Sequence, residues 1–122
     1  MRTLFYSFIG IVLFSCNSAP RADISQFRTG TFETYLDDSD EISIAVRNDS
    51  IQIETYNNVK DTFAIQWNSN FEYELHKINP KKGLDSVPFY VKITGVKDST
   101  YTFKAHYKGS DFKQKGKVIK IK

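Results

Sequence analysis

Apolar and polar residues alternate along most of this chain after residue 27, with the period of two that is typical of β-strands. One apolar side per strand predicts that this side packs in a core and that the other side faces water. The predicted apolar sides carry the following residues: Ile42, Ile44 and Val46; Ile51 and Ile53; Phe63, Ile65 and Trp67; Phe71, Tyr73 and Leu75; Val87, Phe89, Val91 and Ile93; Tyr101, Phe103, Ala105 and Tyr107; Val118, Ile119 and Ile121.

Short turn signals separate these runs. Asn48-Asp49, Asn57-Asn58 and Asn68-Ser69-Asn70 are residues that tolerate left-handed backbone, and Gly95 to Asp98 make a further turn. With residues 27–35 as the first strand, we expect about eight strands joined by short connections. The pattern therefore predicts an all-β antiparallel meander that forms a small closed or partly open β-barrel, with no helix after the first 15 residues.

The N-terminus has a different character. A positive start, Met1-Arg2, precedes the apolar run Leu4 to Phe14, which is too short for a transmembrane helix and fits a secretory signal. The run ends in Leu13-Phe14-Ser15-Cys16, which resembles the lipobox of a type II signal peptide in a bacterial lipoprotein precursor. That resemblance implies cleavage before Cys16, the only cysteine, and its modification with acyl chains such as palmitate. Alternatives are plain secretion with a free cysteine, and an uncleaved anchor.

These features predict a signal peptide at 1–15, a lipidated cysteine and polar tether at 16–26, and one β domain at 27–122. Asn17 and Ser18 differ from the Asp that commonly retains lipoproteins in the inner membrane, and no acidic export run follows Cys16. We therefore expect an outer-membrane lipoprotein on the periplasmic face, with the membrane as a partner through Cys16. The chain resembles the short lipoproteins of Gram-negative envelopes.

Charge is concentrated near the C-terminus. Seven lysines and one acid, Asp111, lie between Lys104 and Lys122, whereas the part after residue 15 carries a net charge of only +2, which is no nucleic-acid signature. The densest basic patch comprises Lys113, Lys115, Lys117, Lys120 and Lys122. Lysines on an edge strand prevent sheet-to-sheet aggregation, and this is the first interpretation. The second is a patch that faces anionic lipid head groups or an acidic partner.

Gly30-Thr31-Phe32, in the expected first strand, resembles the Gly-x-Trp signature that opens lipocalin-like barrels, with Phe in place of Trp. That resemblance implies an eight-stranded antiparallel barrel that holds an apolar ligand. The chain is shorter than that family, lacks its C-terminal helix, and has no arginine after Arg47 to pack on the first-strand aromatic ring. A bend at a strand glycine also explains the motif.

No catalytic, metal or cofactor motif emerges. The acidic loop from Asp37 to Glu41 lacks the spacing and glycine of a calcium loop, and His76 and His106 have no partners at metal-ligand spacing. Glu72 and Glu74 are expected on the surface. No nucleophile elbow or phosphate-binding loop occurs. We therefore expect no metal, no cofactor and no enzyme activity.

The aromatic content, ten Phe, seven Tyr and one Trp, is the remaining signal. Aromatic residues are ordinary strand formers, but Tyr and Trp also suit cavities with one wet end. The favoured hypothesis is a lipid-anchored periplasmic protein that binds an apolar or lipid-like ligand without catalysis. Its expected lining is Phe63, Ile65, Trp67, Tyr73, Phe89, Tyr101 and Phe103. The alternative is a protein-interaction module, or accessory subunit of an envelope complex, with a solid core.

Overall fold

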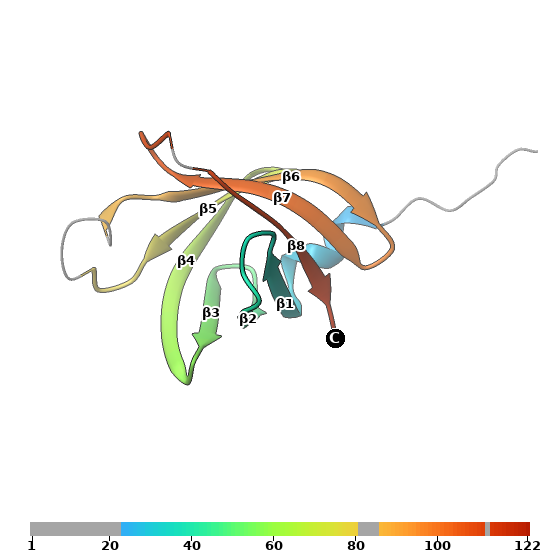
Figure 1. The fold of residues 1–122 in the computed structure, drawn as a ribbon, viewed down its shortest axis with the longest axis horizontal. Coiled ribbons are helices and arrows are strands. Elements are labelled where there is room, and N and C mark those ends of the chain that lie inside the picture. The colour runs from blue at the N-terminus through green and yellow to red at the C-terminus, as the bar shows by residue number, and fades with distance from the viewer. Residues whose placement is uncertain (1–22, 81–85, 112) are drawn as a thin grey trace, which may run out of the picture.

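The computed structural model describes residues 23–80, 86–111 and 113–122 and shows a closed barrel of eight antiparallel strands in chain order (Figure 1). This confirms the predicted fold class. One 3-10 helix precedes the strands. The elements are η1 Ile24–Arg28, β1 Gly30–Leu36, β2 Ile42–Arg47, β3 Ile51–Tyr56, β4 Val59–Ser69, β5 Glu72–Lys77, β6 Phe89–Lys97, β7 Thr100–Tyr107 and β8 Gln114–Lys120.

Two of the predicted turns match the backbone, whereas Gly95 to Lys97, also expected in a turn, belong to β6. Asn57 and Asn58 both have positive φ, 51° and 65°, as the tightest hairpin turns require, and they join β3 to β4. Between β2 and β3 the Asn48 side chain accepts hydrogen bonds from the backbone N–H groups of Ser50 and Ile51. Local side-chain chemistry therefore sets these two connections.

The barrel closes where β8 pairs with β1, over the register Phe32↔Lys120 to Leu36↔Gly116. Gly116 is buried at this seam, and a Cβ atom placed there would collide with the backbone carbonyl oxygen of Tyr35. Close approach of two backbones is a common reason for glycine inside a strand. Because β8 pairs with both β7 and β1, it is not an edge strand.

The first strand begins later than predicted. Residues 24–28 form η1, where the Asp23 side chain accepts a hydrogen bond from the Ser25 N–H, and β1 starts only at Gly30, whose φ is +131°. Phe27, expected in the strand, is instead the buried residue of this helix, and the centre of its ring is 4.9 Å from that of Tyr101. The prediction that the chain has no helix after residue 15 thus misses one short 3-10 turn, which covers an end of the barrel.

Strands β2 and β3 face the opposite way from the prediction. Ile42, Val46 and Ile53 are among the most exposed large apolar residues, whereas Ala45 and the polar Arg47 and Gln52 are buried. Counting apolar residues along a strand does not show which side the barrel encloses. Here the interior requires polar groups, and the aliphatic side chains lie outside.

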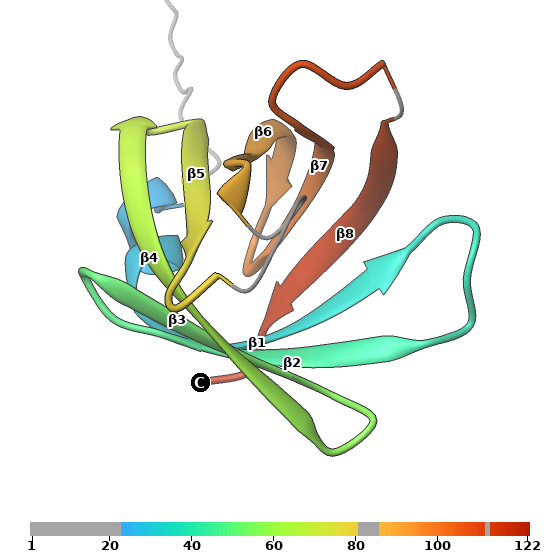
Figure 2. The ribbon, with the colours of Figure 1, turned by 90° about the vertical axis from the view of Figure 1, so that its left-hand side faces the viewer.

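The two ends of the barrel differ. At one end η1 and the β2–β3, β4–β5 and β6–β7 connections surround the aromatic core. The β1–β2, β3–β4, β5–β6 and β7–β8 connections lie at the other end, which we call the mouth. Figure 2 looks into the barrel from the left-hand side of Figure 1, with η1, in blue, behind the strands.

Candidate ligand site at the barrel mouth

A buried arginine closes the end of the barrel next to η1. The Arg47 guanidinium donates to Gln52 Oε1 at 2.9 Å, to the backbone oxygen of Phe27 at 2.7 Å, and to the hydroxyl oxygens of Tyr73 and Tyr101 at 3.3 Å each. Only 4% of Arg47 is exposed. Its hydrogen-bond partners in the described residues are all neutral. The Arg47 cation therefore holds this end of the barrel together through its N–H donors and its contacts with aromatic ring faces. We call Arg47 and these hydrogen-bond partners the plug.

The two tyrosines of this plug are linked to each other, with hydroxyl oxygens 2.8 Å apart. Burial is the main cause that raises the pKa of Tyr73 well above 10, and the nearby Tyr101 raises it further. Tyr73 therefore stays a neutral phenol at physiological pH. In the structure the hydroxyl oxygen of Tyr73 accepts a hydrogen bond from the Arg47 guanidinium, and this phenol keeps its proton.

The seven residues expected to line a ligand cavity fall into two groups. Ile65, Tyr73, Tyr101 and Phe103 belong to the buried core. Trp67 packs against that core, with its ring 4.7 Å from the Tyr73 ring and beneath the Arg28 guanidinium at 4.6 Å. Phe63 and Phe89 line the open recesses of the mouth. The half of the barrel near η1 is thus filled by side chains, and only the other half offers space.

Two recesses make up the mouth, with volumes of about 250 and 430 Å³. They share Glu54, Asp61, Phe63 and Tyr107 in their linings, so they adjoin. A smaller cavity of about 50 Å³ lies deeper, between the mouth and Arg47. Volumes of several hundred Å³ are typical of small-molecule sites. Apolar walls come from Phe63, Leu75, Val87, Phe89 and Tyr107.

The carboxyl groups of Glu54 and Asp61 line both recesses. Burial raises the pKa of Glu54, a hydrogen bond from the Ser43 hydroxyl at 3.0 Å lowers it, and the Asp61 carboxylate raises it further. Lys77 Nζ is 3.2 Å from Asp61 Oδ1. Counting Glu41, Glu54 and Asp61 against Lys77, the lining of the two recesses carries a net charge of −2 with all four groups ionised, and Arg47 beneath them, whose charge lowers the pKa of Glu54, reduces the total to −1. A positively charged group entering the mouth would therefore be attracted.

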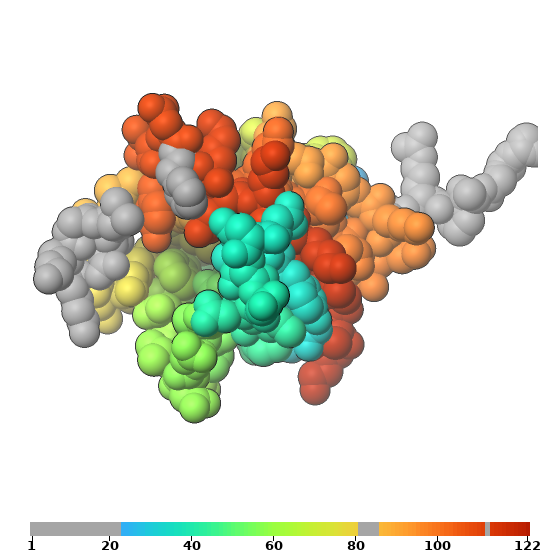
Figure 3. Space-filling model, in the orientation of Figure 1, coloured from blue at the N-terminus to red at the C-terminus, as the bar shows by residue number. Residues whose placement is uncertain are grey.

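The rim of the mouth brings two connections together. Ser39 and Glu41, from the β1–β2 connection, line the same recess as Tyr56 and Asp61 of the β3–β4 hairpin. A hydrogen bond to Glu41 is the largest cause that raises the pKa of the Tyr56 hydroxyl. Figure 3 shows these two connections, in turquoise and green, beside each other on one face. The acidic loop of Asp37 to Glu41 thus forms part of the mouth.

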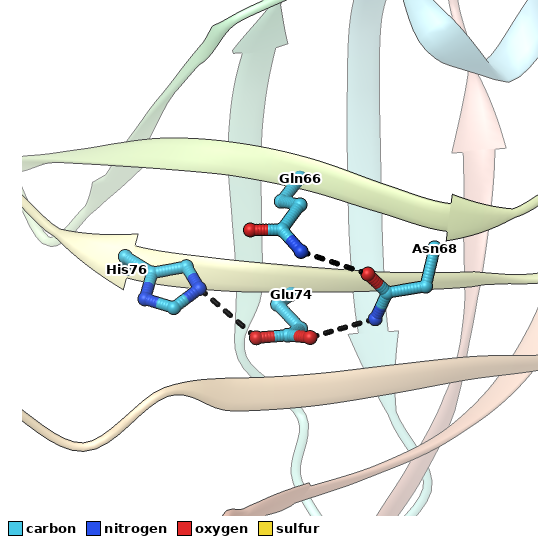
Figure 4. A network of polar contacts seen from close by, with 4 residues as sticks. All are labelled: Gln66, Asn68, Glu74 and His76. Atoms are coloured by element: carbon cyan, nitrogen blue, oxygen red, sulfur yellow. Dashed lines mark hydrogen bonds and ion pairs between the residues drawn. The ribbon is translucent and has the colours of Figure 1, made fainter.

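Glu74 and His76 belong to the outer face of β5 and form a polar network with β4 (Figure 4). Asn68 Nδ2 donates to Glu74 Oε2 at 2.7 Å, Gln66 Nε2 donates to Asn68 Oδ1 at 3.0 Å, and His76 Nε2 lies 3.0 Å from Glu74 Oε1. The hydrogen bond from Asn68 is the largest cause that lowers the pKa of Glu74. The network lies on the outer face of the sheet, where Glu74 was expected, but only 12% of the Glu74 side chain is exposed.

The predicted basic patch is divided between two places. Lys113, Lys115 and Lys117 are exposed on or beside β8, and Lys117 Nζ is 5.4 Å from the centre of the Tyr35 ring. Lys120 is half-buried and donates to the backbone oxygen of Gln26 at 2.7 Å, so it fixes η1. Lys122 is exposed beyond the end of β8. The interpretation of the lysines as protection of an edge strand is wrong, because the closed barrel pairs β8 on both sides.

The N-terminal expectations lie outside the described residues, including Cys16 and the signal segment. The expected tether, 16–26, overlaps η1 at residues 24–26. Within residues 23–80, 86–111 and 113–122, no group of three or more His, Cys, Asp and Glu side chains is placed to hold a metal ion. No helix in the same ranges is long and apolar enough to cross a membrane.

Comparisons with protein families, with curated proteins and with solved structures each return no match to this chain. The site therefore has to be interpreted from its own geometry.

Sequence reasoning missed the interior role of Arg47, Glu54 and Asp61. It noted that no arginine follows Arg47 to pack on the first-strand aromatic ring. In the structure Arg47 itself takes that position, 4.4 Å from the centre of the Phe32 ring. The strand register places Arg47, Gln52, Glu54 and Asp61 on one side of β2, β3 and β4, but alternation alone does not show that this polar side is the enclosed one.

Proposed function

We propose that this protein is a lipid-anchored envelope protein that binds a small amphipathic ligand in the barrel mouth, without catalysis. The observation that carries the proposal is the presence of aromatic walls, Phe63, Phe89 and Tyr107, beside the carboxyl groups of Glu54 and Asp61 in the same lining. An apolar body would pack on the rings, and a positively charged head group would approach the carboxylates. This refines the expected apolar or lipid-like ligand.

Two probes of equal chain length test the ligand class. Decylamine and decanoate, both below their micellar concentrations, would be titrated into the purified full chain by calorimetry. We expect decylamine to bind at least about tenfold more tightly, a difference of about 1.4 kcal/mol. The substitution Glu54→Gln should remove that preference, whereas Phe63→Ala should weaken both probes. Asp49→Asn, at an exposed position in the β2–β3 connection at the other end of the barrel, is the matched control. Equal binding of the two probes would contradict the proposal.

The anchor is tested separately. If Cys16 carries the lipid, Cys16→Ser should move the protein from the membrane fraction to the soluble fraction and abolish labelling by a palmitate analogue. Attachment by two or more acyl chains makes membrane binding stable, so the shift should be nearly complete. Separation of the two membranes would then test the proposed location on the periplasmic side of the outer membrane. If Cys16→Ser fractionated like the wild type, the protein would not be held at the membrane by a lipid on Cys16.

A protein-interaction role is the second candidate, and one observation favours it. Ile42, Val46 and Ile53 place aliphatic side chains on the outer face of β2 and β3, with 47%, 52% and 37% of each residue exposed. Contiguous exposed apolar patches mark interaction sites. Crosslinking in intact cells from a photoreactive residue at position 46 would identify such a partner, with exposed position 60 of β4 as the control.

A further inference from the structure

Three lysines stand directly opposite one another on the outer surface of neighbouring strands. The register pairs Lys92 of β6 with Lys104 of β7, and Lys104 with Lys115 of β8. All three are exposed, and their chain neighbours, such as Val91 and Phe103, are buried. Strands β6, β7 and β8 run side by side in Figure 2. With strands about 4.8 Å apart, the row extends over roughly 10 Å.

This arrangement is unfavourable without an anion. Like charges directly opposite on a sheet are destabilising, and no described carboxylate lies within 4 Å of the ammonium groups of Lys92, Lys104 or Lys115. Protection of a strand edge does not explain the row, because each of these strands is paired on both sides. Glu72, opposite Lys92 on β5, is the one acid that continues the row at its end.

A groove runs beside the row. Its volume is about 500 Å³, and its lining includes Lys92, Lys104, Lys113, His106, Tyr90 and Glu72. Nδ1 of His106 is 2.9 Å from the backbone oxygen of Tyr107, so this nitrogen is the donor, Nε2 of the neutral ring is an acceptor, and the lysines are the donors that a phosphate oxygen would meet. The three lysines and Glu72 together give a net charge of +2 with His106 neutral. A phosphate monoester carries nearly the opposite charge at neutral pH.

We infer that this outer groove, formed by Lys92, Lys104 and Lys113 beside His106 and Tyr90, is a binding site for a phosphate monoester group. Lysine binds phosphate as a mobile point charge, so several lysines converging on one groove suit its three terminal oxygens. The site lies on the outside of the barrel and is independent of the mouth. The phosphate group could belong to a soluble molecule or to the head of a lipid, and both sources present the same chemistry.

Titration of the full chain with glycerol 3-phosphate, in a phosphate-free buffer, tests the site. Calorimetry should show binding that glycerol does not reproduce. Lys104→Gln and Lys92→Gln should each weaken this binding at least fivefold. Lys97→Gln removes an exposed lysine of β6 that does not line the groove, and it should leave the affinity unchanged. Circular dichroism would verify that each variant is folded.

Vesicles distinguish the two sources. Flotation with phosphatidylcholine vesicles that contain phosphatidic acid would show binding dependent on Lys104 if the phosphate belongs to a lipid. Binding of glycerol 3-phosphate alone would identify a soluble ligand. The inference is overturned if neither probe binds, or if Lys97→Gln weakens binding as much as Lys104→Gln does, because the effect would then be one of general surface charge.

Discussion

The guanidinium of Arg47 lies 4.4 Å from the centre of the Phe32 ring, so a cation from β2 covers the first aromatic residue of β1 inside the barrel. Phe32 is fully buried and Arg47 nearly so. The same guanidinium reaches the backbone oxygen of Phe27 in η1. One side chain of β2 thus contacts η1, β1, β3, β5 and β7, and it separates the filled half of the barrel from the mouth.

Arg47→Ala should destabilise the domain by about 3–5 kcal/mol, because it removes the bonds to Gln52, Phe27 and two tyrosines and leaves a cavity. Urea unfolding followed by circular dichroism measures the change. Arg28→Ala is the control, since Arg28 is only half-buried and its main contact is the face of Trp67, worth about 1 kcal/mol or less. Similar losses for both variants would refute a central role for Arg47.

Glu54→Gln should stabilise the domain at neutral pH. Burial and Asp61 raise the pKa of Glu54, so the folded state holds this proton more tightly than the unfolded state does. The contribution of Glu54 to stability is therefore fully present below its ordinary pKa of 4.5 and is lost as pH rises through the raised pKa. Glutamine does not ionise, so the gain should be absent near pH 4 and present at pH 7.

Unfolding of Glu54→Gln and wild type in urea, at several pH values between 4 and 8, measures this difference. Glu72→Gln provides the baseline, because Glu72 is exposed. A stability difference that does not change with pH would show that Glu54 ionises normally in the folded state.

The reversed faces of β2 can be tested with neighbouring residues. Ala45→Asp should unfold the domain or cost more than about 3 kcal/mol, because it buries a charge against the core at a position that is 2% exposed. Val46→Asp, at a position that is 52% exposed, should cost about 1 kcal/mol or less. Thermal unfolding compares the two. The opposite order would mean that the aliphatic side of β2 faces inward.

The sequence pattern was sufficient for the strand count, the antiparallel order and the Asn57-Asn58 turn, because each depends on local spacing or on backbone preferences. It was not sufficient for the direction that β2 faces. Ile42, Ile44 and Val46 form an apolar side by composition, but burial depends on curvature and on Arg47, whose partners come from η1, β3, β5 and β7. Such contacts between distant segments have no signature in a single stretch of sequence.

The residues that line the mouth also divide into those that the sequence predicted and those that it did not. Phe63 and Phe89 were predicted as lining residues from their strands and do line the recesses. The position of Glu54 and Asp61 in the mouth was not predicted, because in the sequence each resembles an exposed acidic residue close to a turn. Only the register Glu54↔Asp61 between β3 and β4 brings them together on the inner side. The same holds for Lys92 and Lys104, which the register of β6, β7 and β8 places in one row with Lys115 of the predicted basic patch.

Closure of the barrel depends on Gly116. In Gly116→Ala the new Cβ would meet the carbonyl oxygen of Tyr35 and the ring of Phe103, so β8 must move away from β1. We expect a loss of about 2–3 kcal/mol and faster amide hydrogen exchange along the β1–β8 seam. Gly109→Ala is the matched control: nothing lies within 4 Å of its added Cβ, and its φ of +83° adds only local strain of about 1 kcal/mol. If exchange at Thr34 and Val118 were unchanged in Gly116→Ala, the two strands would not be packed as closely as this seam requires.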